Sequence, residues 1–280
     1  MLLFTAPADL KSHLEEIHGP KTTLGLLPTM GALHNGHLEL MRRAVAENDL
    51  TVASIFVNPL QFNNPDDLTK YPRTLDEDCA MLEAAGCDLV FAPSAEDMYA
   101  QPPTLKLDFG QLEHVMEGAF RPGHFNGVGI VVARLFHIVQ PDRAYFGQKD
   151  LQQVAVVRRL VEDLAFPLEL VVCPTVREAD GLAMSSRNRR LNPQERVLAP
   201  LIFRTLSEAK ERLLAGQTVA DVKQRVREQF ARQPEFSLEY FEVADARSLQ
   251  PVAATLSDGQ TALCIAANLG AVRLIDNVLF

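Results

Sequence analysis

The sequence predicts an α/β protein, with a Rossmann-like parallel sheet domain over residues 1–175 and a smaller α+β domain over residues 176–280. In the first two thirds of the chain, short apolar runs alternate with helical patterns. Such alternation is typical of a parallel sheet. After about Thr175 the pattern changes to helices followed by strand-like segments. A chain of 280 residues is long enough for one large domain or two modest ones with a full core.

In the first domain, each predicted strand is a short apolar segment. These segments are Thr22–Leu27, Leu50–Val57, Asp88–Ala92, Arg143–Phe146 and Leu168–Cys173. The helical patterns between them lie near Leu38–Asn48, Thr74–Ala85, Val128–Val139 and Leu151–Leu164. Buried runs of this kind indicate a sheet covered by helices on both faces, and such sheets bind ligands beyond the carboxyl ends of their strands.

The second domain begins with helices and ends with strands. A helix is expected from Pro193 to about Ala215, with Pro200 either kinking it or marking its true start. Thr218 is a suitable N-cap for a second helix that runs through Arg232. The expected strands are Leu238–Ala244, Thr261–Asn268 and Ala271–Asn277, with a hairpin at Gly270.

Composition narrows the class of protein. Hydrophobic residues make up 47% and charged residues 22%, as in ordinary soluble globular proteins. The net charge of −9 argues against a nucleic-acid-binding surface. No segment resembles a membrane span, and the N-terminus lacks a basic leader and a long apolar core, so we expect a cytoplasmic protein without a membrane partner. The four cysteines have no metal-ligand spacing and are interpreted as reduced thiols.

The most informative segment is Pro28-Thr29-Met30-Gly31-Ala32-Leu33-His34-Asn35-Gly36-His37, which leads from a predicted strand into a predicted helix. The free N–H groups and the dipole of a helix start favour phosphate. Gly31 and Gly36 allow a tight turn close to a ligand. Two imidazole donors there suit the α-phosphate in nucleotidyl transfer. Read alone, the two histidines also fit a surface or partly buried pair, and a zinc site is conceivable without supporting ligands.

Two further strand ends carry polar groups. Asn58 and Gln61 follow the second predicted strand and suit a substrate with hydroxyls and a carboxylate, although an Asn-Pro turn with an exposed Gln is an equal alternative. Gly147-Gln148-Lys149-Asp150 follows a later strand. There Lys149 suits phosphate and Asp150 suits ribose hydroxyls. Gln153 lies one turn into the next helix. The alternative for this segment is a solvated helix start.

Two glycine-containing loops add cations. Arg121 can bind a carboxylate or phosphate through two parallel hydrogen bonds, and His124 either assists it or fixes the loop. The loop Met184-Ser185-Ser186-Arg187 carries two hydroxyls and a cation that suit departing pyrophosphate, or else it is a polar domain-boundary loop. Acids in Tyr71–Asp78 could hold Mg²⁺ through water, but they are interpreted mainly as structural, because the helix dipole favours acids in a first turn.

Taken in order, these motifs resemble the pantothenate synthetase (pantoate–β-alanine ligase) family of the nucleotidyltransferase superfamily, which includes the class I aminoacyl-tRNA synthetases. The resemblance extends from about Leu24 to Leu191. The matching blocks are Pro28–His37, Phe56–Phe62, Tyr71–Thr74, Arg121–Val128, Gly147–Gln153 and Pro174–Asn188. The C-terminal third is less diagnostic.

The resemblance implies an ATP-dependent ligase in which pantoate forms pantoyl-adenylate with loss of pyrophosphate, and β-alanine then displaces AMP to give pantothenate. It implies catalytic roles for His34, His37, Lys149, Ser185, Ser186 and Arg187. The ATP contacts it implies are Met30, Gly31, Ala32, Leu33, His34, Asn35, Gly36, His37, Gly147, Gln148, Lys149, Asp150, Val176, Met184, Ser185, Ser186 and Arg187. Gln61 and Gln153 would hold pantoate, and the other candidate substrate-binding residues are Asn58, Arg121 and His124.

The resemblance also implies Mg²⁺ accompanying ATP, with no direct protein ligand assigned, and a homodimer. The Met184–Arg187 loop is similar to the Lys-Met-Ser-Lys-Ser loop of the synthetases, but differs at Ser186 and Arg187. Alternatives at this point are an adenylyltransferase that makes a dinucleotide, a ligase that activates another acid, and a nucleotide sensor without catalysis. A tRNA synthetase is disfavoured by the acidic balance and by the lack of an evident anticodon-binding module.

Overall fold

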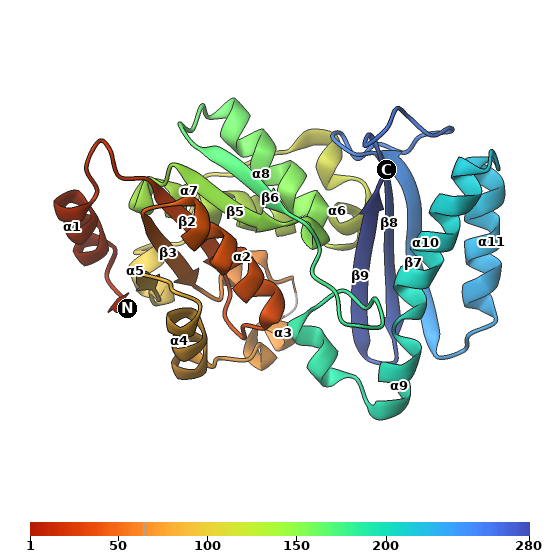
Figure 1. Cartoon of the computed structure of the whole chain (residues 1–280), viewed down its shortest axis with the longest axis horizontal. Coiled ribbons are helices and arrows are strands. Elements are labelled where there is room, and N and C mark those ends of the chain that lie inside the picture. The colour runs from red at the N-terminus through yellow and green to blue at the C-terminus, as the bar shows by residue number, and fades with distance from the viewer. Residues whose placement is uncertain (64) are drawn as a thin grey trace.

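The computed structural model describes residues 1–63 and 65–280, and in this part of the chain nine strands form two sheets. The first sheet has six strands, all parallel, in the order β1-β4-β3-β2-β5-β6 (Figure 1). Its strands are β1 (Leu2–Phe4), β2 (Leu24–Thr29), β3 (Leu50–Ile55), β4 (Leu89–Phe91), β5 (Arg143–Gly147) and β6 (Glu169–Cys173). The predicted Rossmann-like parallel sheet is confirmed.

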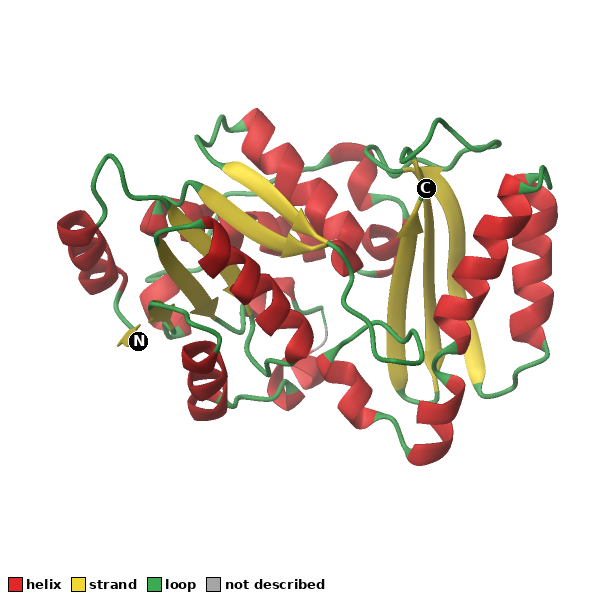
Figure 2. Cartoon of the chain, in the orientation of Figure 1, coloured by secondary structure: helices red, strands yellow, loops and turns green. Residues whose placement is uncertain are grey.

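Helices connect these strands and cover both faces of the sheet (Figure 2). They are α1 (Pro7–Ile17), α2 (Asn35–Glu47), α3 (Pro65–Lys70), α4 (Leu75–Ala84), α5 (Ala95–Met98), α6 (Met116–Phe120), α7 (His124–Val139) and α8 (Leu151–Asp163). Short 3-10 helices are η1 (Pro59–Gln61), η2 (Gly110–Glu113) and η3 (Gln148–Asp150). These connections leave the carboxyl ends of the strands facing the second sheet.

Alternate residues of each strand enter two separate cores. Leu26 of β2 packs with α1, α7 and α8, whereas the next residue, Leu27, packs with α2 and α4. On β5, Phe146 and Tyr145 divide between the two cores in the same way. Both faces of the strands are therefore buried, which explains why they read as continuous apolar runs rather than as alternating ones.

The second sheet is antiparallel and consists of β7 (Phe236–Asp245), β8 (Thr261–Leu269) and β9 (Val272–Leu279), in that order. The helices α10 (Leu201–Leu214) and α11 (Val219–Ala231) pack against it and form a third core. The remaining elements, η4 (Ser186–Arg190) and α9 (Pro193–Leu198), connect the two sheets (Figure 1). A smaller cluster that includes Met116, Leu151 and Cys264 joins the two parts of the molecule.

Several expectations for the second part are confirmed. Thr218 caps α11 by accepting a hydrogen bond from the N–H of Asp221. Gly270, at a φ of +54°, makes the turn of the β8–β9 hairpin, where Leu269 pairs with Val272. The expected continuous helix from 193 to 215 is wrong. Pro200 separates α9 from α10, because proline cannot continue the helical hydrogen bonding, and the alternative that it marks a helix start is right.

Other predicted boundaries shift by a few residues. β2 runs from Leu24 to Thr29, so the motif Pro28–His37 begins inside a strand. β3 ends at Ile55. α2 begins at Asn35 rather than at Leu38, because His34 serves as its N-cap. α7 begins at His124 rather than at Val128, and α6 occupies part of the expected loop before it. The sequence patterns did not predict β1, α1, α3, α5 and α6.

The cysteines are free in the described chain, and three of the four are buried. Among the helices of residues 1–63 and 65–280, none is long and apolar enough to cross a membrane.

Candidate active site

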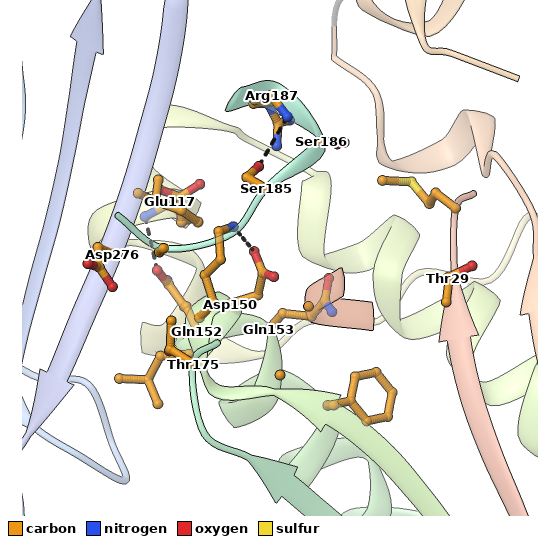
Figure 3. A pocket seen from close by; sticks show the side chains of 18 of the residues that line it. Thr29, Glu117, Asp150, Gln152, Gln153, Thr175, Ser185, Ser186, Arg187 and Asp276 are labelled. Carbon is orange, nitrogen blue, oxygen red and sulfur yellow. Dashed lines mark hydrogen bonds and ion pairs between the residues drawn. The ribbon is translucent and has the colours of Figure 1, made fainter. Parts of the chain in front are cut away.

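A cavity lies at the carboxyl ends of the parallel strands and extends to the antiparallel sheet (Figure 3). It is lined by Thr29 at the end of β2, Gln61 after β3, Lys149 after β5 and Thr175 after β6. The strand order reverses between β2 and β5, and in open α/β sheets such a switch point is where ligands bind. The predicted convergence of three distant strand ends on one crevice is therefore confirmed.

The two histidines lie at the start of α2. His34 is its N-cap, and its Nδ1 accepts a hydrogen bond from the N–H of Gly36 at 3.1 Å. The ring centroids of His34 and His37 are 4.1 Å apart, and both residues line the cavity. A Cβ added at Gly36 would lie 2.8 Å from the His34 ring, so any other residue here would displace that ring. The start of α2 thus presents both imidazoles to the cavity.

A buried carboxylate fixes the turn before the histidines. Asp78 of α4 accepts hydrogen bonds from the N–H groups of Ala32 and Leu33, at 2.9 and 2.7 Å. Gly31 and Ala32 both have a positive φ, +80° and +51°, which is strained for alanine. The structural interpretation of Asp78 is confirmed. Ala32 and Leu33 were predicted to contact ATP, and their N–H groups are already bound to Asp78.

The local environment keeps both histidines neutral at pH 7. Burial, together with the nearby charges of Lys149 and Arg189, lowers the pKa of His34 to about 4. Burial, together with His34 and Lys149, lowers the pKa of His37 to about 3. Because Nδ1 of neutral His34 accepts a hydrogen bond, its proton is on Nε2. Nδ1 of His37 is buried without a hydrogen-bond partner among the described residues.

Gln61 lines the cavity, whereas Asn58 supports it from behind. The Asn58 side-chain amide donates to Oε1 of Gln61 and to the carbonyl of Gly127, each at 3.1 Å. Its oxygen accepts from the Tyr99 hydroxyl at 3.0 Å. A Cβ at Gly127 would lie 2.3 Å from the carbonyl oxygen of Leu60, so α7 packs directly on the turn that presents Gln61.

Arg121 and His124 lie beside Gln61. His124 Nδ1 is 2.8 Å from the carbonyl oxygen of Gln61, and its Nε2 is 3.3 Å from Nη1 of Arg121. Burial, together with the charge of Arg121, lowers the pKa of His124 to about 4. The nearest carboxylate oxygen of Glu117 is 3.9 Å from Arg121, a long contact. The Arg121 guanidinium therefore keeps donors available to a ligand in the cavity.

Residues 147–150 form the turn after β5. Lys149 lines the cavity, and its Nζ is 3.7 Å from Oδ1 of Asp150. The Gln148 side chain points to the second sheet and donates to Oδ1 of Asn277 at 3.2 Å. Gln153 lines the cavity from the first turn of α8 (Figure 3). The predicted meeting of Lys149, Asp150 and Gln153 at one crevice is confirmed.

The loop with the two serines reaches the cavity from the connection between the sheets. Ser185 caps η4 and accepts a hydrogen bond from the N–H of Arg187 at 3.2 Å (Figure 3). This loop is anchored on the histidine side, because Arg189 donates to the carbonyl of Leu33 at 3.2 Å. Val176 and Met184 face the cavity and are joined by a backbone hydrogen bond of 2.9 Å.

Strand β9 supplies a wall of the cavity that the sequence motifs did not predict. Arg273, Asp276 and Asn277 line the cavity from this strand. Arg273 forms a bidentate pair with Glu117 of α6, at 2.6 and 2.8 Å. Although burial alone would raise it, the hydrogen bonds from Arg273 and Tyr240 hold the pKa of Glu117 below its ordinary value. The available signal was the presence of Arg273, Asp276 and Asn277 inside a predicted strand.

Carboxylates in the cavity are mostly paired with arginine. Glu117 is bound to Arg273, and Asp276 is bound to Arg177, whereas Asp150 lies beside a lysine. Within residues 1–63 and 68–280, no group of three histidine, cysteine or acidic side chains is placed to hold a metal ion.

A switch-point cavity with a helix N-terminus, two neutral histidines and a lysine defines a nucleotide-binding α/β enzyme. The particular family follows from comparison with known proteins. A model of the pantoate-beta-alanine ligase family matches residues 2–279. The chain is 50% identical over 272 residues to the pantothenate synthetase of Bacteroides thetaiotaomicron, covering 97% of this chain and 96% of that protein.

Solved structures give the same result. The crystal structure of pantothenate synthetase from Thermus thermophilus matches with a TM-score of 0.92 and 45% identity, covering 99% of each chain. The pantoate-beta-alanine ligase of Francisella tularensis, in a complex with beta-gamma ATP and β-alanine, matches with a TM-score of 0.81 and 32% identity, covering 100% of this chain and 97% of that chain. This chain belongs to the pantoate–β-alanine ligase family, and its activity joins pantoate to β-alanine to form pantothenate.

Proposed function

We propose that the switch-point cavity performs this ligation in two steps. In the first, the carboxylate of pantoate attacks the α-phosphorus of ATP, and pyrophosphate leaves. In the second, the amine of β-alanine attacks the carbonyl carbon of pantoyl-adenylate, and AMP leaves. The observation that carries the proposal is that His34, His37 and Lys149, from two distant strand ends, line one cavity. Neither step needs a covalent enzyme nucleophile, because positioning and electrostatic stabilisation suffice.

Residues on the histidine side bind ATP. His34 and His37 donate N–H hydrogen bonds to the α-phosphate, whose negative charge grows during attack. Because both imidazoles are neutral at pH 7, they act as dipolar donors, and Lys149 supplies the positive charge. The dipole of α2, whose N-terminal end lies at His34, adds to this field. Asp150 accepts from ribose hydroxyls, and the backbone near Val176 and Met184 contacts the nucleotide.

Residues on the β3 and α7 side bind the acid. Gln61 and Gln153 donate to and accept from the hydroxyls and carboxylate of pantoate, and Gln61 also borders the β-alanine site. Arg121 has unfilled donors, which suit a substrate carboxylate. His124 orients Arg121 and Gln61, and Asn58 acts through Gln61 rather than on the substrate.

The loop at residues 184–187 binds the departing pyrophosphate. Arg187 is exposed on the described surface, whereas Ser185 and Ser186 lie at the N-terminal end of η4. Closure of this loop over ATP places two hydroxyls and a guanidinium on the β- and γ-phosphates. Mg²⁺ would accompany ATP and neutralise charge on its phosphates, with no direct protein ligand assigned to it.

Three further assignments belong to this proposal. The domain boundary falls between residues 175 and 176, just after β6 and before the core of the second sheet begins at Leu182. The enzyme acts as a homodimer, as the family resemblance implies, and it acts in the cytoplasm. Titration of oligomeric state by analytical ultracentrifugation tests the dimer; a monomer at all micromolar concentrations contradicts it.

Exchange of labelled pyrophosphate into ATP tests the proposed function. We expect exchange that depends on pantoate, and AMP release that requires β-alanine in addition. A panel of other hydroxy acids and amines serves as the control for substrate choice. Exchange without pantoate, or AMP release at full rate without β-alanine, contradicts the two-step reaction.

A further inference from the structure

We infer that Asn277, on the last strand of the chain, is a positioning residue that holds Lys149 in place for adenylate formation. This inference rests on the proposed role of Lys149 at the phosphates of ATP. Asn277 lies in β9 of the second sheet, whereas Lys149 follows β5 of the first. The two sheets therefore meet at the turn that carries the lysine.

Asn277 is buried, with 2% of its surface exposed, and its side chain makes three hydrogen bonds to one turn. Its amide nitrogen donates to the carbonyl oxygens of Gln148 and Lys149, each at 2.9 Å. Its Oδ1 accepts from Nε2 of Gln148 at 3.2 Å. Both amide hydrogens and one acceptor position of the carbonyl oxygen are thus used. Asn277 therefore has no N–H left to donate to a substrate, so it acts through the turn.

The turn needs such support because it is short. η3 (Gln148–Asp150) directly joins the end of β5 to α8, and its N-cap, Gly147, provides no side-chain hydrogen bond. Asn277 binds two consecutive carbonyls of this turn, one of them that of Lys149 itself. The direction in which the Lys149 side chain leaves the backbone therefore depends on a contact from the other sheet.

The neighbouring residue on β9 holds the other candidate phosphate loop. Asp276 forms a bidentate pair with Arg177, at 2.6 and 3.0 Å, and the backbone carbonyl of Asn277 accepts from the same arginine at 3.3 Å. Arg177 begins the small hairpin, closed by its bridge to Ala183, that leads into the loop at residues 184–187. Two adjacent residues of one strand thus fix the relative positions of Lys149 and this loop.

A double-mutant cycle in pyrophosphate exchange tests the inference. We expect Asn277→Ala to lower the pantoate-dependent exchange rate by roughly 10- to 100-fold, since a misplacement of about 1 Å has effects of that size. If Asn277 acts through Lys149, the double variant Asn277→Ala/Lys149→Ala is no slower than Lys149→Ala, within about twofold. A merely structural asparagine would add its own loss in both backgrounds.

Arg247→Ala is the matched control. Arg247 also joins the second part of the chain to the first, through Glu162 of α8 at 3.1 Å, but both side chains are largely exposed and distant from the turn. Its exchange rate should stay within about twofold of the wild type. Asn277→Ser retains one donor and replaces the alanine variant in the cycle if the latter does not fold; we expect it to lose less activity.

The outcomes separate the inference from the proposed function. If the wild-type enzyme shows no pantoate-dependent exchange, both the proposed function and the inference about Asn277 are overturned. If exchange is unchanged in Lys149→Ala, the role of Lys149 is overturned, and with it that of Asn277. Normal exchange in the folded Asn277 variants, or losses that multiply in the double variant, overturns the inference alone. Loss that disappears in the Lys149→Ala background supports it.

Discussion

The two sheets contribute to the same cavity in different ways. The parallel sheet offers side chains from the loops after its strands, and several of these groups have unused hydrogen-bonding capacity, as at His37 and Arg121. The antiparallel sheet offers side chains from within β9, and Asp276 and Asn277 are already bound to the protein there. The difference indicates a division of tasks: loop residues meet the substrates, and strand residues hold the loops.

The largest expected effect lies on the supporting side. Asp276→Ala removes the buried partner of the partly buried Arg177 guanidinium, and breaking a buried pair costs about 3–5 kcal/mol. Urea unfolding should measure this loss of stability. Asp180→Ala is the matched control, because the Asp180–Arg196 pair is exposed and worth at most about 1 kcal/mol. Equal losses of unfolding free energy in both variants would show that the Asp276–Arg177 pair stabilises the protein no more than an exposed pair does.

On the substrate side, His37→Ala should slow pantoyl-adenylate formation by roughly 10²–10³-fold, as the loss of one preorganised donor does elsewhere. Rapid-quench single-turnover kinetics measure this step directly. His137→Ala, an exposed histidine that packs on Phe166 of the parallel-sheet domain, should leave it unchanged. An adenylation rate near that of the wild type in His37→Ala would contradict the proposed role.

Lys149→Ala should impair the use of ATP by roughly 10–100-fold while the fold survives, because a cavity lysine acts as a point charge on phosphate and contributes little to the core. Steady-state kinetics with ATP as the varied substrate, together with a melting curve, separate the two effects. Lys11→Ala, which removes an exposed lysine from α1, is the control. Unchanged kinetics in Lys149→Ala would place the lysine outside the reaction.

A smaller effect concerns pH. The pKa of His37 is lowered from 6.5 to about 3 by burial, so the unfolded chain binds a proton more readily than the folded enzyme. The free energy of unfolding should therefore fall as the pH falls from about 7 towards 4. The stability associated with neutral His37 is fully present only above the pKa that this histidine has in the unfolded chain. His37→Gln should lose less stability than the wild type between pH 7 and pH 5, measured by urea unfolding. An identical pH dependence would indicate an unshifted pKa.

Much of the parallel-sheet part of the site follows from the sequence, because its residues occur in short motifs directly after apolar runs. Parallel strands bring their carboxyl ends to one edge, so the position of these motifs in the chain is enough to predict that His34, Gln61 and Lys149 converge. Local chemistry also identifies the Thr218 cap and the Gly270 turn.

Supporting residues are harder to find, because their partners are remote in the chain. Asp78 binds the N–H groups of Ala32 and Leu33 across 46 and 45 positions, and Asn277 binds the Lys149 carbonyl across 128. No local pattern marks such contacts. The assignment of Asn58 to substrate shows the same problem, since its amide is engaged by Gln61 and by Gly127 on α7.

A crystal structure of the enzyme with pantoyl-adenylate, formed from ATP and pantoate without β-alanine, tests the division of tasks most directly. We predict that the α-phosphate lies within about 3 Å of His34 or His37 and of Lys149, with the pantoyl group beside Gln61 and Gln153. Asn277 should still donate to the carbonyls of Gln148 and Lys149. A phosphate bound by Asp276 or Asn277, or located away from both histidines, would contradict the account.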